Sequence, residues 1–264
     1  MVILEVENVT KMFGGLTANQ DVTMTVEKGT ITAVIGPNGA GKTTFFNMIT
    51  GVYQPTSGDM KLEGKSLIGL KADEVAKRGI SRTFQNIRLF GEMSVIENVL
   101  VGMHTQLKTK LLGIFFNLPR TKKEELEAEE EAYRLLKHFN LAHLLNEKAN
   151  NLSYGAQRKL EIARALATNP KLILLDEPAA GMNPKETREL TEIIKRMGKE
   201  FDVTVLLIEH DMKLVMEISE HIIVLDHGEK IAEGNPEEIR TNPKVIEAYL
   251  GSSAVQTPAT TQPV

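Results

Sequence analysis

The sequence predicts an α/β fold with a parallel sheet, an N-terminal antiparallel β subdomain and an inserted helical subdomain. Three observations support this prediction. Apolar and polar side chains largely alternate over the first 30 residues, short apolar runs are followed three times by helical patterns, and residues 93–169 contain several helical patterns and no convincing strand. A chain of 264 residues with 42% hydrophobic residues can bury a core of its own without disulfide bonds.

The N-terminal region has the period-two pattern of half-buried strands. Its alternating apolar residues are Val2, Leu4, Val6, Val22, Met24 and Val26. Because one face of an antiparallel sheet packs on the core while the other meets water, this alternation predicts an antiparallel sheet.

Strands followed by helices come next. Residues 31–35 (ITAVI) form an apolar run, the segment GPNGAG interrupts it, and helical spacing continues to Gly51. The same order recurs at residues 172–176, followed by a helix from Pro184, and at residues 203–211, followed by a helix to about Ile218. This alternation predicts a parallel sheet with both faces covered.

The region between these units is expected to be a helical subdomain at about residues 93–169. Its clearest apolar face consists of Ala128, Ala132, Leu135, Leu136 and Phe139. Six glutamates lie between Glu124 and Glu131, and they indicate either a solvated face or an interaction surface. Residues 252–264 are small and polar without periodicity, so we expect a disordered tail there.

Charge and composition narrow the classes of function. With 31 basic and 35 acidic residues the net charge is −4, so no nucleic-acid partner is expected. The sequence has no cysteine, which excludes a disulfide framework, a cysteine-ligated metal site and thiol catalysis. The N-terminus lacks signal-peptide features and no apolar run reaches the ~18 residues of a transmembrane helix, so we expect any membrane role to require a partner.

A phosphate-binding loop is predicted at residues 36–43. GPNGAGKT fits the pattern G-x-x-x-x-G-K-[ST], follows an apolar strand and opens a helix, whose amide groups favour an anion. A glycine-rich turn is the alternative interpretation. Lys42 is expected to reach the β- and γ-phosphates and Thr43 to bind Mg²⁺. The residues expected to contact nucleotide are Gly36, Pro37, Asn38, Gly39, Ala40, Gly41, Lys42, Thr43 and Thr44.

An acidic pair at the end of a strand complements this loop. In LILLDE, four apolar residues precede Asp176 and Glu177. Asp176 is predicted to lie on the Mg²⁺ side, and Glu177 is predicted to orient or deprotonate an attacking water. An ordinary strand end is the alternative, and the pairing with Lys42 favours the catalytic interpretation.

Residues 1–250 resemble the nucleotide-binding subunits of ABC transporters. The resemblance comes from an ordered set of motifs: Phe13, GPNGAGKT, Gln85 in RTFQN, NLSYGAQRKLEIARAL, LILLDEP, AGMNP and His210 in LLIEHD. It implies a single nucleotide-binding domain over residues 1–251, with an ABC-type ATPase core that hydrolyses ATP with Mg²⁺. It further implies that Phe13 stacks on adenine, that Gln85 contacts Mg²⁺ or the attacking water, and that His210 contacts the γ-phosphate.

The segment LSYGAQ resembles the family signature LSGGQ. Tyr154 replaces the first glycine and Ala156 the glutamine, whereas Ser153 and Gly155 remain. Ser153 is expected to begin a helix, whose N-terminus forms a second anion site. In this family that site contacts the ATP bound to the opposite subunit, so a second ABC ATPase subunit is an expected partner, in a homodimer or a heterodimer.

Several subfamily features look like the larger ATPase subunit of branched-chain amino acid importers. They are LSYGAQ, AAGMNP, IEHDMKLVM and the C-terminal GNPEEIRTNPKVIEAYLG. The resemblance implies uptake of leucine, isoleucine and valine through permease subunits, an indirect extracytoplasmic solute-binding protein, and a peripheral position on the cytoplasmic face of the plasma membrane. The alternatives are the ATPase of a urea importer or lipopolysaccharide exporter, a soluble ABC-type ATPase of DNA repair or translation, and a small-molecule kinase.

The most apolar segment is LLGIFFNL at residues 111–118. Lysine and arginine residues flank it on both sides. A short core helix is one interpretation, and a surface that docks on the permease is the other.

Overall fold

The computed structural model describes residues 1–103 and 119–250, so the segment 111–118 and the tail 252–264 lie outside the described residues. The chain forms two compact units. The first unit is Met1–Ala72 with Leu206–Val264, and the second is Asp73–Val205.

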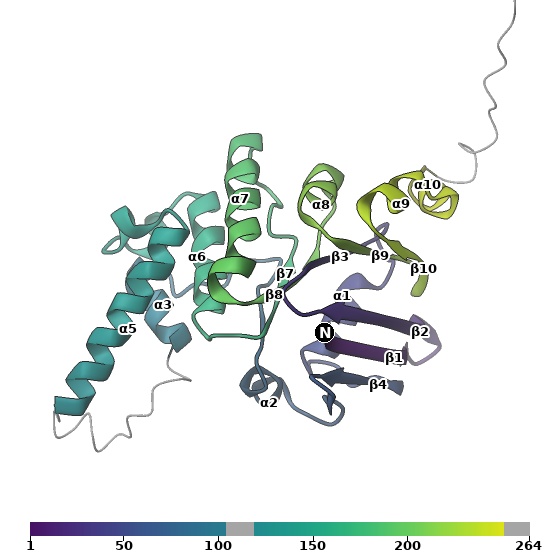
Figure 1. Ribbon diagram of the computed structural model, residues 1–264, viewed down its shortest axis with the longest axis horizontal. Helices are drawn as coiled ribbons and strands as arrows, with labels where there is room; N and C mark the ends of the chain where they lie inside the picture. Colours follow the sequence, from purple (N-terminus) through teal and green to yellow (C-terminus); the bar gives the residue numbers. More distant parts are fainter. Residues whose placement is uncertain (104–118, 251–264) are drawn as a thin grey trace, which may run out of the picture. The chain divides into compact units, whose positions relative to one another are not determined.

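The N-terminal sheet of the first unit is antiparallel, as the alternation predicts. Its strand order is β2-β1-β4-β5, with β1 at Val2–Phe13, β2 at Leu16–Glu27, β4 at Ser57–Leu62 and β5 at Lys65–Ser66 (Figure 1). The buried residues of its inner face include Leu4, Val6, Val22, Met24 and Val26. Period-two patterning therefore identified the core-facing side of this sheet.

The strands of the predicted parallel sheet are neighbours in the order β10-β9-β3 in the first unit and β7-β6 in the second. The bounds are β3 Ile31–Ile35, β6 Ile80–Arg82, β7 Leu172–Asp176, β8 Thr204–Ile208, β9 His221–Asp226 and β10 Glu229–Gly234. Strand β3 pairs parallel with β9, and β6 pairs parallel with β7, which confirms the parallel sheet. Strand β10 adds an antiparallel edge to β9, so the sheet is mixed and mainly parallel.

Four helices of the first unit follow its strands. Helix α1 spans Lys42–Ile49, α8 spans Met212–Ile218, α9 spans Pro236–Thr241 and α10 spans Pro243–Leu250. Helix α1 buries Phe45, Phe46, Met48 and Ile49, the residues that gave the segment its helical spacing. The predicted strand–loop–helix order at residues 31–51 is confirmed.

The second unit contains the predicted helical region. The helices of its described residues are α2 Ala72–Lys77, α3 Val95–Met103, α5 Pro119–His138, α6 Tyr154–Leu166 and α7 Pro184–Phe201. Short 3-10 helices lie at Ala142–Leu144 and Ala149–Asn151, and α2 begins at the last residue of the first unit. Helix α3 lies beside α5 and α6 (Figure 1). On α5, Ala132, Leu135 and Leu136 are buried, as the apolar spacing predicts.

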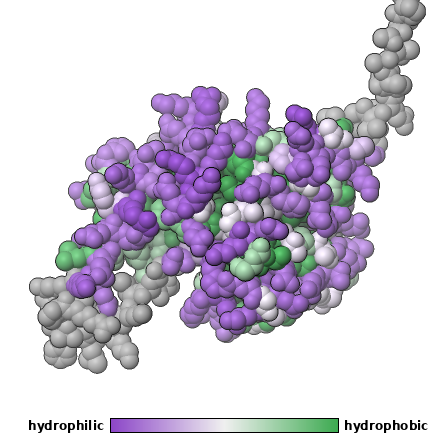
Figure 2. All heavy atoms as spheres, in the orientation of Figure 1, coloured by the Kyte–Doolittle hydropathy of each residue, from purple (hydrophilic) through white to green (hydrophobic). Residues whose placement is uncertain are grey.

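The polar side of α5 is a solvated face. Of the six glutamates between Glu124 and Glu131, four are exposed and the two end residues are half-buried. Hydrophilic residues cover most of the face of the molecule in Figure 2, and hydrophobic residues appear there in small separate patches. Within residues 1–103 and 119–250, every helix is too short or too polar to cross a lipid bilayer.

Candidate active site

The loop between β3 and α1 requires glycine at two positions. Gly36 has a φ of 150° and Gly41 a φ of 93°, backbone conformations that residues with a side chain rarely adopt. A Cβ added at Gly36 would collide with the carbonyl oxygen of Leu225, and one at Gly41 would collide with that of Ala18. The tight path of residues 36–41 therefore depends on these glycines, while Asn38 and Gly39 at the loop tip stay exposed.

Lys42 lies within the curve of this loop. Its side chain is buried, and Nζ donates hydrogen bonds to the carbonyl oxygens of Gly36 at 2.8 Å and Pro37 at 2.9 Å. Gly41 is the N-cap of α1 and has no side chain to cap the helix, which leaves the first-turn amide groups for an anion. Thr43 is exposed and Thr44 half-buried on this first turn, whereas Ala40 is buried.

Phe13 belongs to an exposed aromatic pair. Its ring lies edge-on to Tyr53, with the two centroids 5.2 Å apart, and it remains 42% exposed. Lys11 Nζ lies 4.9 Å from the Phe13 ring centroid, within cation–π range. Phe13 lies opposite Leu16 in the pair of strands β1 and β2. Ala18, whose carbonyl oxygen lies against Gly41 of the loop, is two residues further along β2, or about 7 Å at 3.4 Å per residue. The aromatic pair is therefore close to the phosphate-binding loop.

His210 follows β8 in the first unit and is exposed. The preceding residue, Glu209, is buried and accepts hydrogen bonds from the backbone amides of His210 at 3.0 Å and Asp211 at 3.4 Å. Asp211 then caps α8 by accepting from Lys213 and Leu214 amides. A buried carboxylate and a helix cap thus hold the backbone that presents the His210 ring.

Asp176 ends β7 in the second unit and is buried. Its Oδ2 accepts from Arg82 Nη2 at 2.7 Å, with the two side chains only 4% and 7% exposed. Its backbone amide donates to Thr83 Oγ1 at 3.2 Å. Arg82, the last residue of β6, therefore orients the carboxylate at the end of β7, and Thr83 holds its backbone.

Glu177 and Gln85 lie together. Gln85 Nε2 donates to Glu177 Oε2 at 3.0 Å, although 92 positions separate these two residues. Glu177 has a φ of 48°, an uncommon conformation for a residue with a side chain, and functional sites often hold residues in it. The structure thus joins two of the residues that the sequence analysis assigned to the attacking water.

The signature segment lies at the start of α6. Ser153 is the N-cap, and its hydroxyl accepts from the Ala156 amide at 3.4 Å. Gly155 is buried, and an added Cβ would lie 2.7 Å from Glu186 Oε1 at the start of α7, so a larger residue would displace the Glu186 side chain. Ser153 begins a helix as expected, and the second anion site at the N-terminus of α6 stays a prediction.

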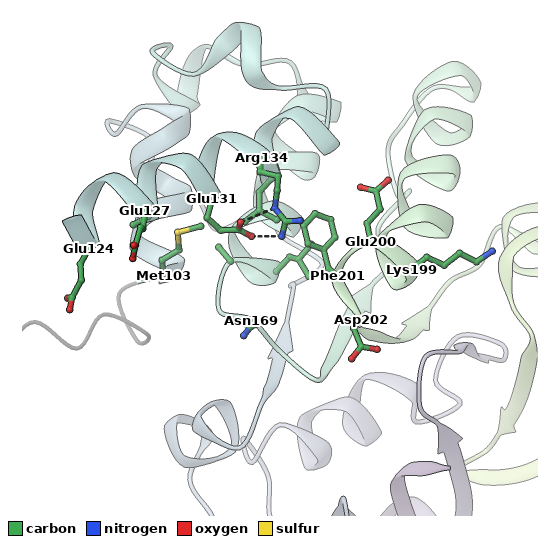
Figure 3. Close-up of a pocket in the computed structure, with 14 residues that line it drawn as sticks. Met103, Glu124, Glu127, Glu131, Arg134, Asn169, Lys199, Glu200, Phe201 and Asp202 are labelled. Carbon is green, nitrogen blue, oxygen red and sulfur yellow. Dashed lines mark hydrogen bonds and ion pairs between the residues drawn. The ribbon is translucent and has the colours of Figure 1, made fainter. Parts of the chain in front are cut away.

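A large groove elsewhere in the second unit contains none of the predicted site residues. It has a volume of about 730 Å³ between α5, the end of α6 and the end of α7. Figure 3 shows Glu131 and Arg134 turned toward each other on α5, at 2.7 Å, with Phe201 beside Arg134. Five of the fourteen residues that line this groove are acidic.

Three residues of the site were missed by the sequence analysis: Tyr53, Arg82 and Glu209. Arg82 is the first residue of RTFQN, and Glu209 directly precedes His210 in LLIEHD, so their place within these motifs was a usable signal. Tyr53 follows Gly51, and its partner Phe13 lies 40 positions away, so no local spacing connects the two aromatic rings.

Comparison with known proteins places the chain in a family. The model of the ABC transporter family matches residues 19–180. A second model, described as branched-chain amino acid ATP-binding cassette transporter, matches residues 229–255.

Curated relatives match over nearly the whole chain. The branched-chain amino acid transport ATP-binding protein BraF of Pseudomonas aeruginosa is 51% identical over 95% of this chain and 98% of its own length. The corresponding LivG of Escherichia coli is 49% identical over the same shares.

Solved structures agree with these sequence matches. The ADP conformation of MJ1267, an ATP-binding cassette of an ABC transporter, has a TM-score of 0.82 and 37% identity, over 95% of this chain and 99% of that one. A dimer of the ATP-binding cassette MJ0796 with ADP and phosphate has a TM-score of 0.74 and 28% identity, over 89% and 99%. The chain therefore belongs to the ABC transporter family, among the ATP-binding proteins of branched-chain amino acid transporters.

Proposed function

We propose that this protein hydrolyses ATP to power the import of leucine, isoleucine and valine, with residues 1–251 acting as one nucleotide-binding domain. The hydrogen bond between Gln85 and Glu177, next to Asp176 at the end of β7, is the observation that supports hydrolysis. The amino acid class is supported by the identity to BraF and LivG across the chain and by the family model at residues 229–255.

The nucleotide is bound by residues of the first unit. Residues 36–44 hold the phosphates through backbone amides, with Lys42 at the β- and γ-phosphates. Phe13, supported by Tyr53, stacks on the adenine ring. His210 donates a hydrogen bond to the γ-phosphate from the backbone that Glu209 holds.

Hydrolysis transfers the γ-phosphoryl group to water. The Glu177 carboxylate accepts a proton from the water, whose oxygen attacks the γ-phosphorus, and the bond to the β–γ bridging oxygen breaks to release ADP. Gln85 orients Glu177 through its amide group and contacts the same water. These roles need no covalent enzyme intermediate.

The oxygen donors of the site suit Mg²⁺. The Thr43 hydroxyl, the Gln85 amide oxygen and the Asp176 carboxylate are hard ligands, the kind that Mg²⁺ takes together with substrate phosphates. Asp176 is already oriented by Arg82 and Thr83. When bound, Mg²⁺ neutralises charge on the phosphate oxygens.

A second ABC ATPase subunit completes the site. Ser153, Gly155 and the N-terminus of α6 contact the γ-phosphate of ATP bound to the opposite subunit, in a homodimer or a heterodimer. The resemblance to a dimeric cassette with ADP and phosphate supports this arrangement. Tyr154 and Ala156, which depart from the family signature, leave the Ser153 cap in place.

Permease subunits are the membrane partners. A groove of about 640 Å³ in the second unit is suited to receive a cytoplasmic helix of a permease, because its lining is largely apolar and Phe90 is 48% exposed. The groove includes Arg88, Leu89, Phe90, Val101 and Arg164. Docking there holds the protein at the cytoplasmic face of the plasma membrane, where an extracytoplasmic solute-binding protein acts on it indirectly.

Transport in proteoliposomes tests this function. The protein is reconstituted with the permease subunits, the second ATPase subunit and the solute-binding protein of its transporter, and ATP-dependent uptake of labelled leucine is measured. We expect uptake that isoleucine and valine compete for and that Glu177→Gln abolishes. Uptake of urea in place of leucine, or no uptake beyond that of Glu177→Gln, would contradict the proposal.

A further inference from the structure

Arg158 is a fully buried cation in the middle of the second unit. It lies one helical turn after Tyr154 on α6, and its side chain is 0% exposed. Nη1 donates to the carbonyl oxygen of Phe84 and Nη2 to that of Gln85, both at 2.6 Å. The guanidinium thus holds the two peptide carbonyls that lie on either side of the Gln85 Cα atom.

Two further bonds fix the orientation of the Arg158 guanidinium. Nη1 donates to Glu161 Oε2 at 2.9 Å, and Nη2 donates to the Tyr154 hydroxyl at 3.3 Å. Tyr154, Arg158 and Glu161 are spaced four and three positions apart, so they share one face of α6. The same guanidinium therefore contacts the first turn of α6 and the Gln85 backbone.

Glu161 holds the other end of this segment. Its Oε1 accepts from the Arg88 backbone amide at 3.1 Å, and Arg164 donates to the Arg88 carbonyl oxygen. Burial raises the pKa of the Glu161 carboxyl above its ordinary value, against the lowering effects of the Arg88 amide and Arg158. Residues 84–88 are thus attached to α6 at both ends.

A buried ion pair of this kind is a weak source of stability. Removing two charges from water offsets most of their attraction, and a well-packed apolar pair stabilises a fold at least as well. The bonds from Arg158 instead fix the geometry of residues 84–88, and Gln85 passes that geometry to Glu177.

We propose that Arg158 is a positioning residue for ATP hydrolysis that couples the signature end of α6 to the Gln85–Glu177 pair of the same subunit. This inference rests on the proposed function, in which the N-terminus of α6 contacts the ATP of the opposite subunit. A shift of that helix end reaches Gln85 through Tyr154 and Arg158, so each subunit's water-activating pair responds to the nucleotide that its partner holds.

Steady-state ATPase kinetics of the full chain with Arg158→Met test the proposal. Methionine keeps much of the side-chain volume and removes every donor. We expect kcat to fall at least tenfold while the affinity for a fluorescent ATP analogue stays within twofold, because residues of the phosphate-binding loop are untouched. Lys159→Met is the matched control: Lys159 is a buried cation of the same helix that pairs with Glu189, and kcat should stay within twofold.

A double-mutant cycle separates positioning from general damage to the fold. In a Gln85→Ala background, Arg158→Met should change kcat less than twofold, since its effect passes through Gln85. Arg158→Lys keeps the charge beside Glu161 but loses the forked donation to two carbonyls, so it should fold and have an intermediate kcat even if Arg158→Met does not fold.

The outcomes distinguish this inference from the proposed function. If the wild-type chain hydrolyses ATP but Arg158→Lys matches its kcat, the coupling role is wrong and the proposed function stands. The same conclusion follows if Arg158→Met lowers kcat equally with and without Gln85. A wild-type chain that hydrolyses no ATP, alone or with its partner subunits, contradicts the proposed function itself.

Discussion

At the scale of single residues, two ion pairs of similar geometry lie in very different surroundings. Arg82 and Asp176 approach to 2.7 Å with side chains 7% and 4% exposed. Lys77 and Asp73 approach to 2.9 Å with side chains 70% and 65% exposed. Water screens the second pair and not the first, so the same chemical change should have unequal consequences.

We predict that Asp176→Asn lowers the free energy of unfolding by about 3 kcal/mol, because it leaves the Arg82 guanidinium buried without its carboxylate partner. Asp73→Asn, the matched control, should change it by less than about 0.5 kcal/mol. Urea unfolding followed by circular dichroism measures both values. Equal losses from the two substitutions would show that burial of the Arg82–Asp176 pair does not matter for stability.

At the scale of elements, two helices begin in the same way. The side chains of Asn183 before α7 and Asn235 before α9 each accept backbone hydrogen bonds. In return, the Glu186 and Glu238 carboxylates accept from the backbone amides of these asparagines, which completes two capping boxes. A proline follows each cap at the first helical position, where its fixed φ suits the helix. These helix starts are thus encoded within four consecutive residues.

We predict that Asn183→Ala destabilises the protein by about 1 kcal/mol, whereas Asn183→Asp stays within about 0.5 kcal/mol of wild type. Aspartate accepts the same hydrogen bonds and adds a negative charge at the positive end of the helix. Differential scanning calorimetry should show a decrease of roughly 2–4 °C for alanine only. Asn235→Ala is the control for an equivalent cap, and a larger loss from aspartate than from alanine would contradict the capping role.

At the scale of the whole molecule, ATP is expected to bring two chains together. In the proposed function, each chain supplies a phosphate-binding loop and a signature helix end, and the ATP of one chain contacts the second anion site of the other. Hydrolysis ends this state, so a variant that binds ATP without hydrolysing it should accumulate the dimer.

We predict that Glu177→Gln elutes as a dimer with ATP and Mg²⁺ and as a monomer with ADP, because the amide cannot accept the proton of the attacking water. Size-exclusion chromatography with light scattering measures the mass. A dimer that forms only after addition of a second, different ABC ATPase subunit would identify a heterodimer. Hydrolysis by this variant at the wild-type rate would show that Glu177 is not the proton acceptor.

The spacing of apolar, polar and glycine residues along the chain was enough to predict several strands, several helices and the phosphate-binding loop. Alternation identified the antiparallel sheet, apolar runs followed by helical spacing identified β3–α1 and β7–α7, and the loop at residues 36–43 was evident from its glycines and Lys42. Short elements such as β5, with two residues, and β6, with three, were not predicted, since a period needs more residues than they contain.

The sequence by itself therefore determined many of the longer elements, the phosphate-binding loop and the chemical types available at the site. Only the tertiary structure decided which of those groups meet: Arg82 with Asp176 across 94 positions, Arg158 with the Phe84 carbonyl across 74, and Gln85 with Glu177 across 92. The physical reason is that periodicity, capping and turn chemistry act within a few residues, whereas a buried charge finds its partner through the folding of distant segments onto one another.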